Sequence, residues 1–101
     1  MIKLPIYSDT GWINIANNVI GRKVNDLVII TFNNYVCTTQ GWQYQFALPS
    51  GWVPKIQFFG TLYINDTYAS LRMLQIVEGC ISIHKPDDAR EELLGSIAYF
   101  V

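Results

Sequence analysis

The chain has 101 residues, of which 50% are hydrophobic and 15% are charged, and its formal net charge is −1. This length fits one domain, the apolar content excludes intrinsic disorder, and the charge balance argues against nucleic-acid binding through phosphate contacts. No apolar run approaches the roughly 18–20 residues of a membrane-spanning helix, so we expect no membrane insertion. The low charge indicates that part of the surface of this small domain meets something other than water.

The first half of the chain consists of short apolar runs separated by turn signals, a pattern typical of β-strands. Strands are predicted over residues 10–16, 22–24, 27–32 and 35–39. The run 27–32 is continuously apolar, which indicates a strand that is buried on both faces. Asn25 and Asp26 predict a turn before this run, and Asn33 and Asn34 predict a break after it.

The clearest strand covers residues 42–48, where alternation predicts one apolar face and one polar face. The apolar face consists of Trp42, Tyr44, Phe46 and Leu48. We therefore expect Trp42 in the core, and Trp12 is interpreted as structural as well. The following loop, 49–54, carries two prolines and Gly51 and is predicted to be rigid.

The second half continues with two hairpins and a charged segment. Strands are predicted over residues 55–64, 68–77, 80–84 and 96–101, with hairpin turns at 65–67 and 78–79. Pro86 suits the first turn of a helix and Gly95 suits a C-cap, so a short helical turn or a structured loop is expected over 86–94. These seven or eight antiparallel strands predict an all-β fold, a β-sandwich or jelly roll. It forms one domain over residues 1–101, with 1–7 interpreted as the end of a stalk or linker.

The sequence lacks the signatures of an enzyme. His84 is the single histidine, and no nucleophile elbow, HExxH motif or phosphate-binding glycine loop is present. We therefore expect no catalysis, no metal and no other cofactor. Cys37 and Cys80 lack metal-ligand spacing, and two free buried thiols are favoured over one disulfide.

Candidate ligand-binding residues lie in and around the charged segment. Residues 85–92 carry six of the fifteen charges, which predicts an exposed segment and the first place to look for a partner. Sugars are commonly held by an aromatic face together with planar polar side chains that bridge neighbouring hydroxyls. The candidates of these types are His84, Asp87, Arg90, Arg72 and Trp52.

Each candidate also has a structural interpretation, and both interpretations stay open. His84 is expected to be partly exposed at the end of a strand, and Arg72 is expected on the wet face of its strand. Asp87 and Asp88 fit a solvated turn. Trp52 has the best prospect of partial exposure among the tryptophans, although packing is favoured for it too.

Several motifs together resemble a known family. They are Asp9-Thr-Gly-Trp12, the run 22–32, the loop 47–54 (ALPSGWVP), the hairpin 78–83 (EGCISI) and the last strand 95–101 (GSIAYFV). In order and spacing they resemble the C-terminal head domains of phage tail fibres and baseplate receptor-binding proteins, of siphophages that infect lactococci, streptococci and other Gram-positive hosts. The family more often has a polar loop where this chain has its charged stretch.

This resemblance implies a homotrimer at the phage tail tip or baseplate, which is part of the virion and is assembled in the host cytoplasm. It implies a non-catalytic, metal-free head that recognises a host cell-wall saccharide or a teichoic-acid component. Lactococcal heads hold sugar with an aromatic, His, Asp and Arg, and here Arg72 aligns with such a histidine and Ile83 with such an aromatic.

Two other functions are compatible with the same sequence. The domain could be a structural tail or baseplate module that trimerises or docks other tail proteins without any glycan ligand. It could also be a stand-alone carbohydrate-binding module or adhesin domain of a secreted protein. A sugar-binding pocket would favour the receptor-binding head over the structural module. A disulfide between Cys37 and Cys80 would favour the secreted carbohydrate-binding module.

Overall fold

The computed structural model describes residues 5, 7–65 and 70–101. Eight strands occur in these residues: β1 (Ile13–Ala16), β2 (Val19–Val24), β3 (Leu27–Cys37), β4 (Gly41–Ala47), β5 (Phe58–Ile64), β6 (Leu71–Val77), β7 (Cys80–Lys85) and β8 (Glu91–Phe100). No helix is found in the described part of the chain. The predicted loop 65–67 lies mostly outside the described residues.

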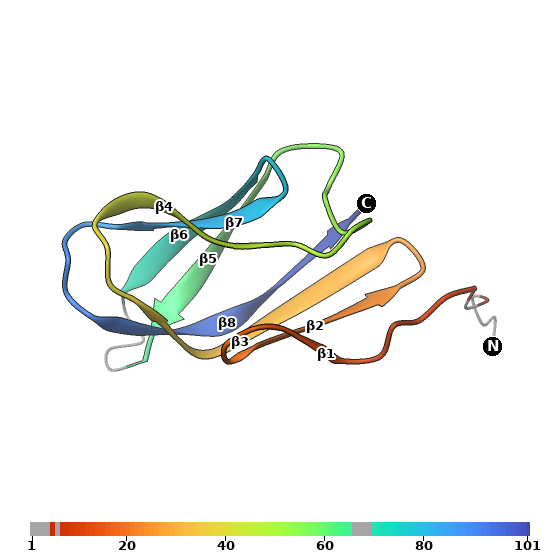
Figure 1. Ribbon diagram of the computed structural model, residues 1–101, viewed down its shortest axis with the longest axis horizontal. Helices are drawn as coiled ribbons and strands as arrows, with labels where there is room; N and C mark the ends of the chain where they lie inside the picture. The colour runs from red at the N-terminus through yellow and green to blue at the C-terminus, as the bar shows by residue number, and fades with distance from the viewer. Residues whose placement is uncertain (1–4, 6, 66–69) are drawn as a thin grey trace.

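All eight strands pair antiparallel in one sheet, in the order β1-β2-β3-β8-β5-β6-β7-β4. The sheet curls so strongly that its β4–β7–β6 part lies over its β1–β2–β3 part, with β8 and β5 between them (Figure 1). The predicted all-β antiparallel class is therefore confirmed. The two layers belong to one continuous sheet, whereas a sandwich consists of two separate sheets.

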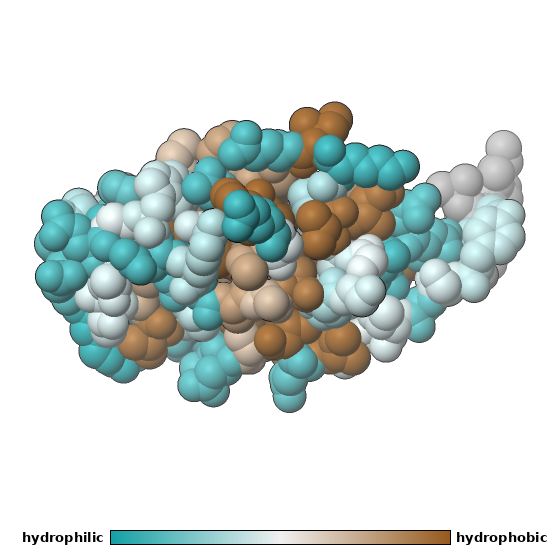
Figure 2. Space-filling model, turned by 45° about the horizontal axis from the view of Figure 1, so that its top comes forward, coloured by the Kyte–Doolittle hydropathy of each residue, from teal (hydrophilic) through white to brown (hydrophobic). Residues whose placement is uncertain are grey.

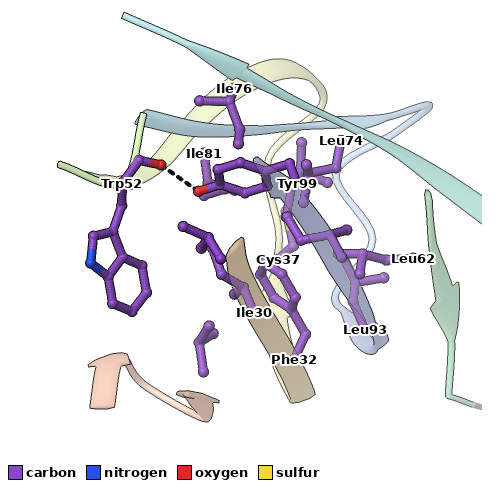
Figure 3. Packing of buried hydrophobic residues seen from close by; sticks show 14 of the residues in the cluster. Ile30, Phe32, Cys37, Trp52, Leu62, Leu74, Ile76, Ile81, Leu93 and Tyr99 are labelled. Carbon is purple, nitrogen blue, oxygen red and sulfur yellow. Dashed lines mark hydrogen bonds between the residues drawn. The ribbon is translucent and has the colours of Figure 1, made fainter. Parts of the chain in front are cut away.

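The core lies inside this curl and is built from both layers. β3 contributes Ile30 and Phe32, β6 contributes Leu74, and β7 contributes Ile81, and all four are at most 1% exposed. Figure 3 shows these side chains converging from opposite sides of the curl. Each fully buried side chain of this size stabilises the fold by roughly 1.5–3 kcal/mol. The curl thus gives a single sheet the interior that two sheets would otherwise provide.

Positive backbone φ angles mark the turns that the sequence predicts. Asn25 has φ 52° in the β2–β3 turn, and Glu78 and Gly79 have φ 52° and 77° in the β6–β7 turn. Two consecutive positive φ angles are the geometry of the tight hairpin turn that matches the twist of its strands. Both predicted turns are confirmed.

Two predicted boundaries are wrong, for the same reason. Asn33 and Asn34 do not end the strand, because Asn34 adopts φ 58° as a bulge and β3 continues to Cys37. Of the two alternatives for 86–94, the helical turn is absent and the loop is present, but the loop ends at residue 90 because β8 begins at Glu91. In both places pairing between β3 and β8 extends over a segment whose local sequence disfavours a strand.

A second bulge decides which side chains of β4 face the core. Tyr44 pairs with Ser82 and Phe46 pairs with Ile81, so Gln45 is an extra residue in the ladder. Because an extra residue shifts the alternation by one, Phe46 faces the core while Trp42 and Tyr44 face outward. Trp42 is 41% exposed, so its predicted place in the core is wrong.

Candidate functional site

The charged segment is mainly a structural cluster at the end of the molecule where β7 and β8 are joined. Arg72 on β6 donates from Nε to Glu91 Oε1 at 2.8 Å and from a terminal nitrogen to Glu91 Oε2 at 2.7 Å. These hydrogen bonds lower the pKa of Glu91 and raise the pKa of Arg72. The predicted wet-face position of Arg72 is wrong, because its side chain is only 17% exposed.

Lys85 completes this cluster from the end of β7, and none of its side chain is exposed. Its Nζ donates to the carbonyl oxygens of Asp87 and Ala89 and lies 3.7 Å from Glu91 Oε1. A buried ammonium requires such partners, since it has lost its water. Lys85 therefore fixes the loop 86–90 from inside, and the expectation that the whole charged segment is exposed is wrong.

The remaining charged candidates are exposed but engaged locally. Asp87 accepts a hydrogen bond from the backbone N–H of Ala89 at 2.9 Å, and Arg90 lies 3.2 Å from Glu92. Arg90 keeps 63% of its side chain exposed, so it remains accessible to a ligand. The structure thus brings Arg72 and Asp87 to one end of the molecule, with Lys85 between them.

Trp52 is packed, as was favoured for it, whereas Trp12 and Trp42 are more exposed than predicted. Trp52 is 3% exposed, whereas Trp12 and Trp42 are 50% and 41% exposed. A turn with Gly51 at φ 83° folds Trp52 into the core, where its main-chain oxygen accepts a 2.6 Å hydrogen bond from Tyr99 (Figure 3). Burial raises the pKa of Tyr99. The ring of Trp52 is therefore unavailable to a ligand.

Trp42 and His84 form an exposed aromatic group, of which only His84 was a candidate from the sequence. They are direct cross-strand partners on β4 and β7, and their ring centroids lie 5.2 Å apart at an interplanar angle of 56°. His84 is half-buried, in agreement with its predicted partial exposure. We call this pair the Trp42 platform. The bulge at Gln45 could not be foreseen from alternation, so no sequence signal pointed to it.

Polar contacts join the loop 86–90 to the residues at the start of β4. Asp88 Oδ1 accepts a 2.7 Å hydrogen bond from the backbone N–H of Gln40, and the Gln40 amide donates to the Pro86 carbonyl at 3.1 Å. Gln43 donates to the Gln40 carbonyl at 3.3 Å. These contacts hold two amides and one carboxylate close to the residues that lead into Trp42, which is the mixture of groups that binds sugar hydroxyls.

The outer faces of β5 and β6 carry a second exposed group, which is apolar and uncharged. We call it the β5–β6 patch; it consists of Phe59, Tyr63, Leu71 and Met73, which are 47–51% exposed. Register places Tyr63 opposite Leu71, and Phe59 opposite Gln75. In the view of Figure 2 hydrophobic side chains likewise reach the surface over the middle of the molecule, while its left end is hydrophilic.

The two thiols are free, in agreement with the prediction. Cys37 is buried at the end of β3 and Cys80 is half-buried at the start of β7. Burial raises the pKa of Cys37. Across residues 5, 7–65 and 70–101, no three His, Cys, Asp or Glu side chains gather in a geometry that could hold a metal ion.

Comparisons with known proteins add no family. No family model matches the sequence, and no curated protein matches it. Within the part of the chain that the structure describes, no helix has the length and apolar character needed to cross a bilayer.

Proposed function

We propose that this chain is a non-catalytic, saccharide-binding head that assembles as a homotrimer at a phage tail tip or baseplate. The observation that carries the binding proposal is the Trp42 platform, an exposed indole held against an imidazole on two paired strands. An indole face covers the C–H side of a sugar ring, and planar polar groups beside it select the hydroxyls. The sequence motifs that resemble phage head domains carry the assignment to a tail.

The platform is rigid, which supports a role in binding for its exposed indole. Trp42 lies in a paired strand, its ring contacts His84, and the loop next to it is fixed by the buried Lys85. Binding to a rigid aromatic avoids the entropy cost of ordering a mobile side chain. Among the predicted candidates, His84 is part of the platform and Asp87 and Arg90 are exposed in or next to the loop 86–90, whereas Trp52 and Arg72 serve the fold.

Binding of cell-wall polymers tests this proposal. The wild-type chain is titrated with purified Gram-positive cell-wall polysaccharide and with teichoic acid, and Trp42→Ala is expected to weaken binding by about tenfold or more, since about 1.4 kcal/mol of lost stacking corresponds to tenfold. The matched control is Trp12→Ala, which removes a similarly exposed indole from the bend before β1. Absence of binding by the wild type, or equal losses in both variants, contradicts the proposal.

A second candidate function is a trimerisation or docking module without a glycan ligand, and the β5–β6 patch favours it. Four half-exposed apolar side chains without a charge among them are typical of a surface that is covered in an oligomer. Light scattering tests this, with a trimer expected for the wild type and a smaller species for Met73→Glu. Ser50→Glu adds the same charge in an exposed turn and is expected to leave the trimer intact. A wild-type monomer contradicts the trimer in both candidate functions.

A further inference from the structure

An open cleft is formed by residues of the β1–β2 hairpin and of the neighbouring strand β3. It encloses about 570 Å³ and is lined by Asn14, Ala16, Asn17, Asn18, Ile20, Thr31, Phe32 and Asn33. This volume is in the range of small-molecule sites, roughly 300–1,000 Å³. We call it the asparagine cleft. It contains none of the residues of the platform or of the charged cluster.

The lining combines free amides with fixed walls. The side chains of Asn14, Asn17 and Asn33 make no hydrogen bond to any other residue that the structure describes. The walls are held by the backbone, because the Asn33 N–H donates to the Asn18 carbonyl at 2.9 Å and Asn18 adopts φ 62° in the hairpin turn. Two amides of the hairpin, Asn14 and Asn17, and one of β3, Asn33, therefore line the cleft without a side-chain partner among the described residues.

The chemistry of these groups selects a neutral ligand. Each amide offers two N–H donors and one carbonyl acceptor, which suits a pair of neighbouring hydroxyls that must both donate and accept. No charged side chain lines the cleft, so nothing there compensates an ionised ligand for its lost hydration. Ile20, which is 38% exposed, supplies apolar surface for the C–H groups of the same ligand.

We propose that the asparagine cleft is a second binding site, which takes a neutral polyhydroxylated ligand such as a hexose unit. It shares no residue with the Trp42 platform, so the variant Trp42→Ala distinguishes binding at one site from binding at the other. Two sites per chain would let one saccharide polymer engage the protein at two points. Such engagement raises the overall affinity without any change at either site.

Side-chain amide resonances in a ¹H–¹⁵N spectrum test this proposal directly. The probes are methyl glucoside, methyl galactoside and glycerol, titrated into the wild-type chain and into Trp42→Ala. We expect the NH₂ signals of Asn14, Asn17 and Asn33 to shift in both proteins, with dissociation constants of about 1 mM or weaker, as is usual for affinities of a few kcal/mol. If the same amide signals still shift in Trp42→Ala, the ligand binds at this site and not at the platform.

Isosteric variants give the second measurement. Asn14→Asp keeps the shape but replaces the two donors by a charge, and we expect about fivefold or greater weakening for the neutral probes. Asn33→Asp replaces it if Asn14→Asp fails to fold, which a loss of chemical-shift dispersion in the spectrum would show. Gln57→Glu, the same change on an exposed loop, is expected to have no effect. Absence of amide shifts with every neutral probe, shifts with inorganic phosphate alone, or loss of the shifts in Trp42→Ala would overturn the proposal.

Discussion

The charged end of the molecule and its uncharged binding surfaces use polar groups in opposite ways. At the charged end, Lys85, Glu91 and Arg72 are bonded to one another or to the chain, and little of them reaches solvent. At the Trp42 platform an indole is exposed beside an imidazole, and the asparagine cleft is lined by side chains without charge. The buried charges of this small domain therefore stabilise the fold, and the groups that remain exposed for a partner are aromatic rings, amides and Arg90.

This difference follows from the cost of removing charge from water. A charge that loses its water must be paired, and once paired it offers nothing to a ligand. Neutral amides and indoles can remain half exposed at little cost and still form hydrogen bonds or stacking contacts. Variants that change the stability of the fold but not binding, or binding but not stability, therefore test this difference.

The largest effect is expected for Lys85→Ala. Removal of a buried cation leaves Glu91 and two main-chain carbonyls short of a partner, and we expect a loss of about 3–5 kcal/mol in the free energy of unfolding. Urea denaturation measures it. Lys55→Ala, at an exposed lysine, is expected to cost at most about 0.5 kcal/mol. Equal losses in the free energy of unfolding for the two variants would contradict the structural role of Lys85.

The next effect concerns the pair of Arg72 and Glu91. Each single variant, Arg72→Ala or Glu91→Gln, is expected to cost about 1.5–3 kcal/mol, the range for hydrogen bonds to charged groups. The double variant should cost less than the sum, because the two side chains act on each other. A strictly additive double-mutant cycle would show that the pair contributes nothing jointly.

The same pair predicts a dependence of stability on pH. Arg72 lowers the pKa of Glu91 below its ordinary value of 4.5, so this contribution is present above that value and is lost as the pH falls through the folded-state pKa. The stability difference between wild type and Glu91→Gln should therefore be constant near neutral pH and shrink under acid. A difference that grows below pH 4.5 would contradict this assignment.

A smaller effect on stability is expected at the platform. Trp42→Ala should cost about 1 kcal/mol or less while it abolishes most polymer binding, because the ring is half exposed. Trp52→Ala, at a buried ring, should cost about 3–5 kcal/mol. Thermal or urea unfolding of the two variants, with binding of Trp42→Ala measured in parallel, checks this. Similar stability losses in both would contradict the outward position of Trp42.

The smallest effect is expected for Arg90→Ala. Its ion pair with Glu92 is exposed, and such pairs contribute about 0–1 kcal/mol. Stability should therefore be nearly unchanged, and any loss of binding to an anionic teichoic acid would mark Arg90 as a contact for that polymer. A large loss of stability would show that Arg90 belongs to the structural cluster with Lys85.

Much of the fold could be predicted because its signals are local. The turns at Asn25 and at Glu78 and Gly79 follow from residues that accept positive φ, and β-branched runs predict most of the strands. The candidate site was predicted only in part. His84 was named, but its partner Trp42 was assigned to the core, because alternation over 42–48 gives no sign of the bulge.

The sequence by itself determined the all-β class and the antiparallel hairpins, since these depend on neighbouring residues and on composition. Tertiary structure alone decided which side of each strand is inside. One extra residue in β4 turned Trp42 outward, pairing with β3 extended β8 through a charged stretch, and the curl of the sheet enclosed Lys85. These outcomes depend on partners far apart in the chain, and such contacts leave no pattern in the local sequence.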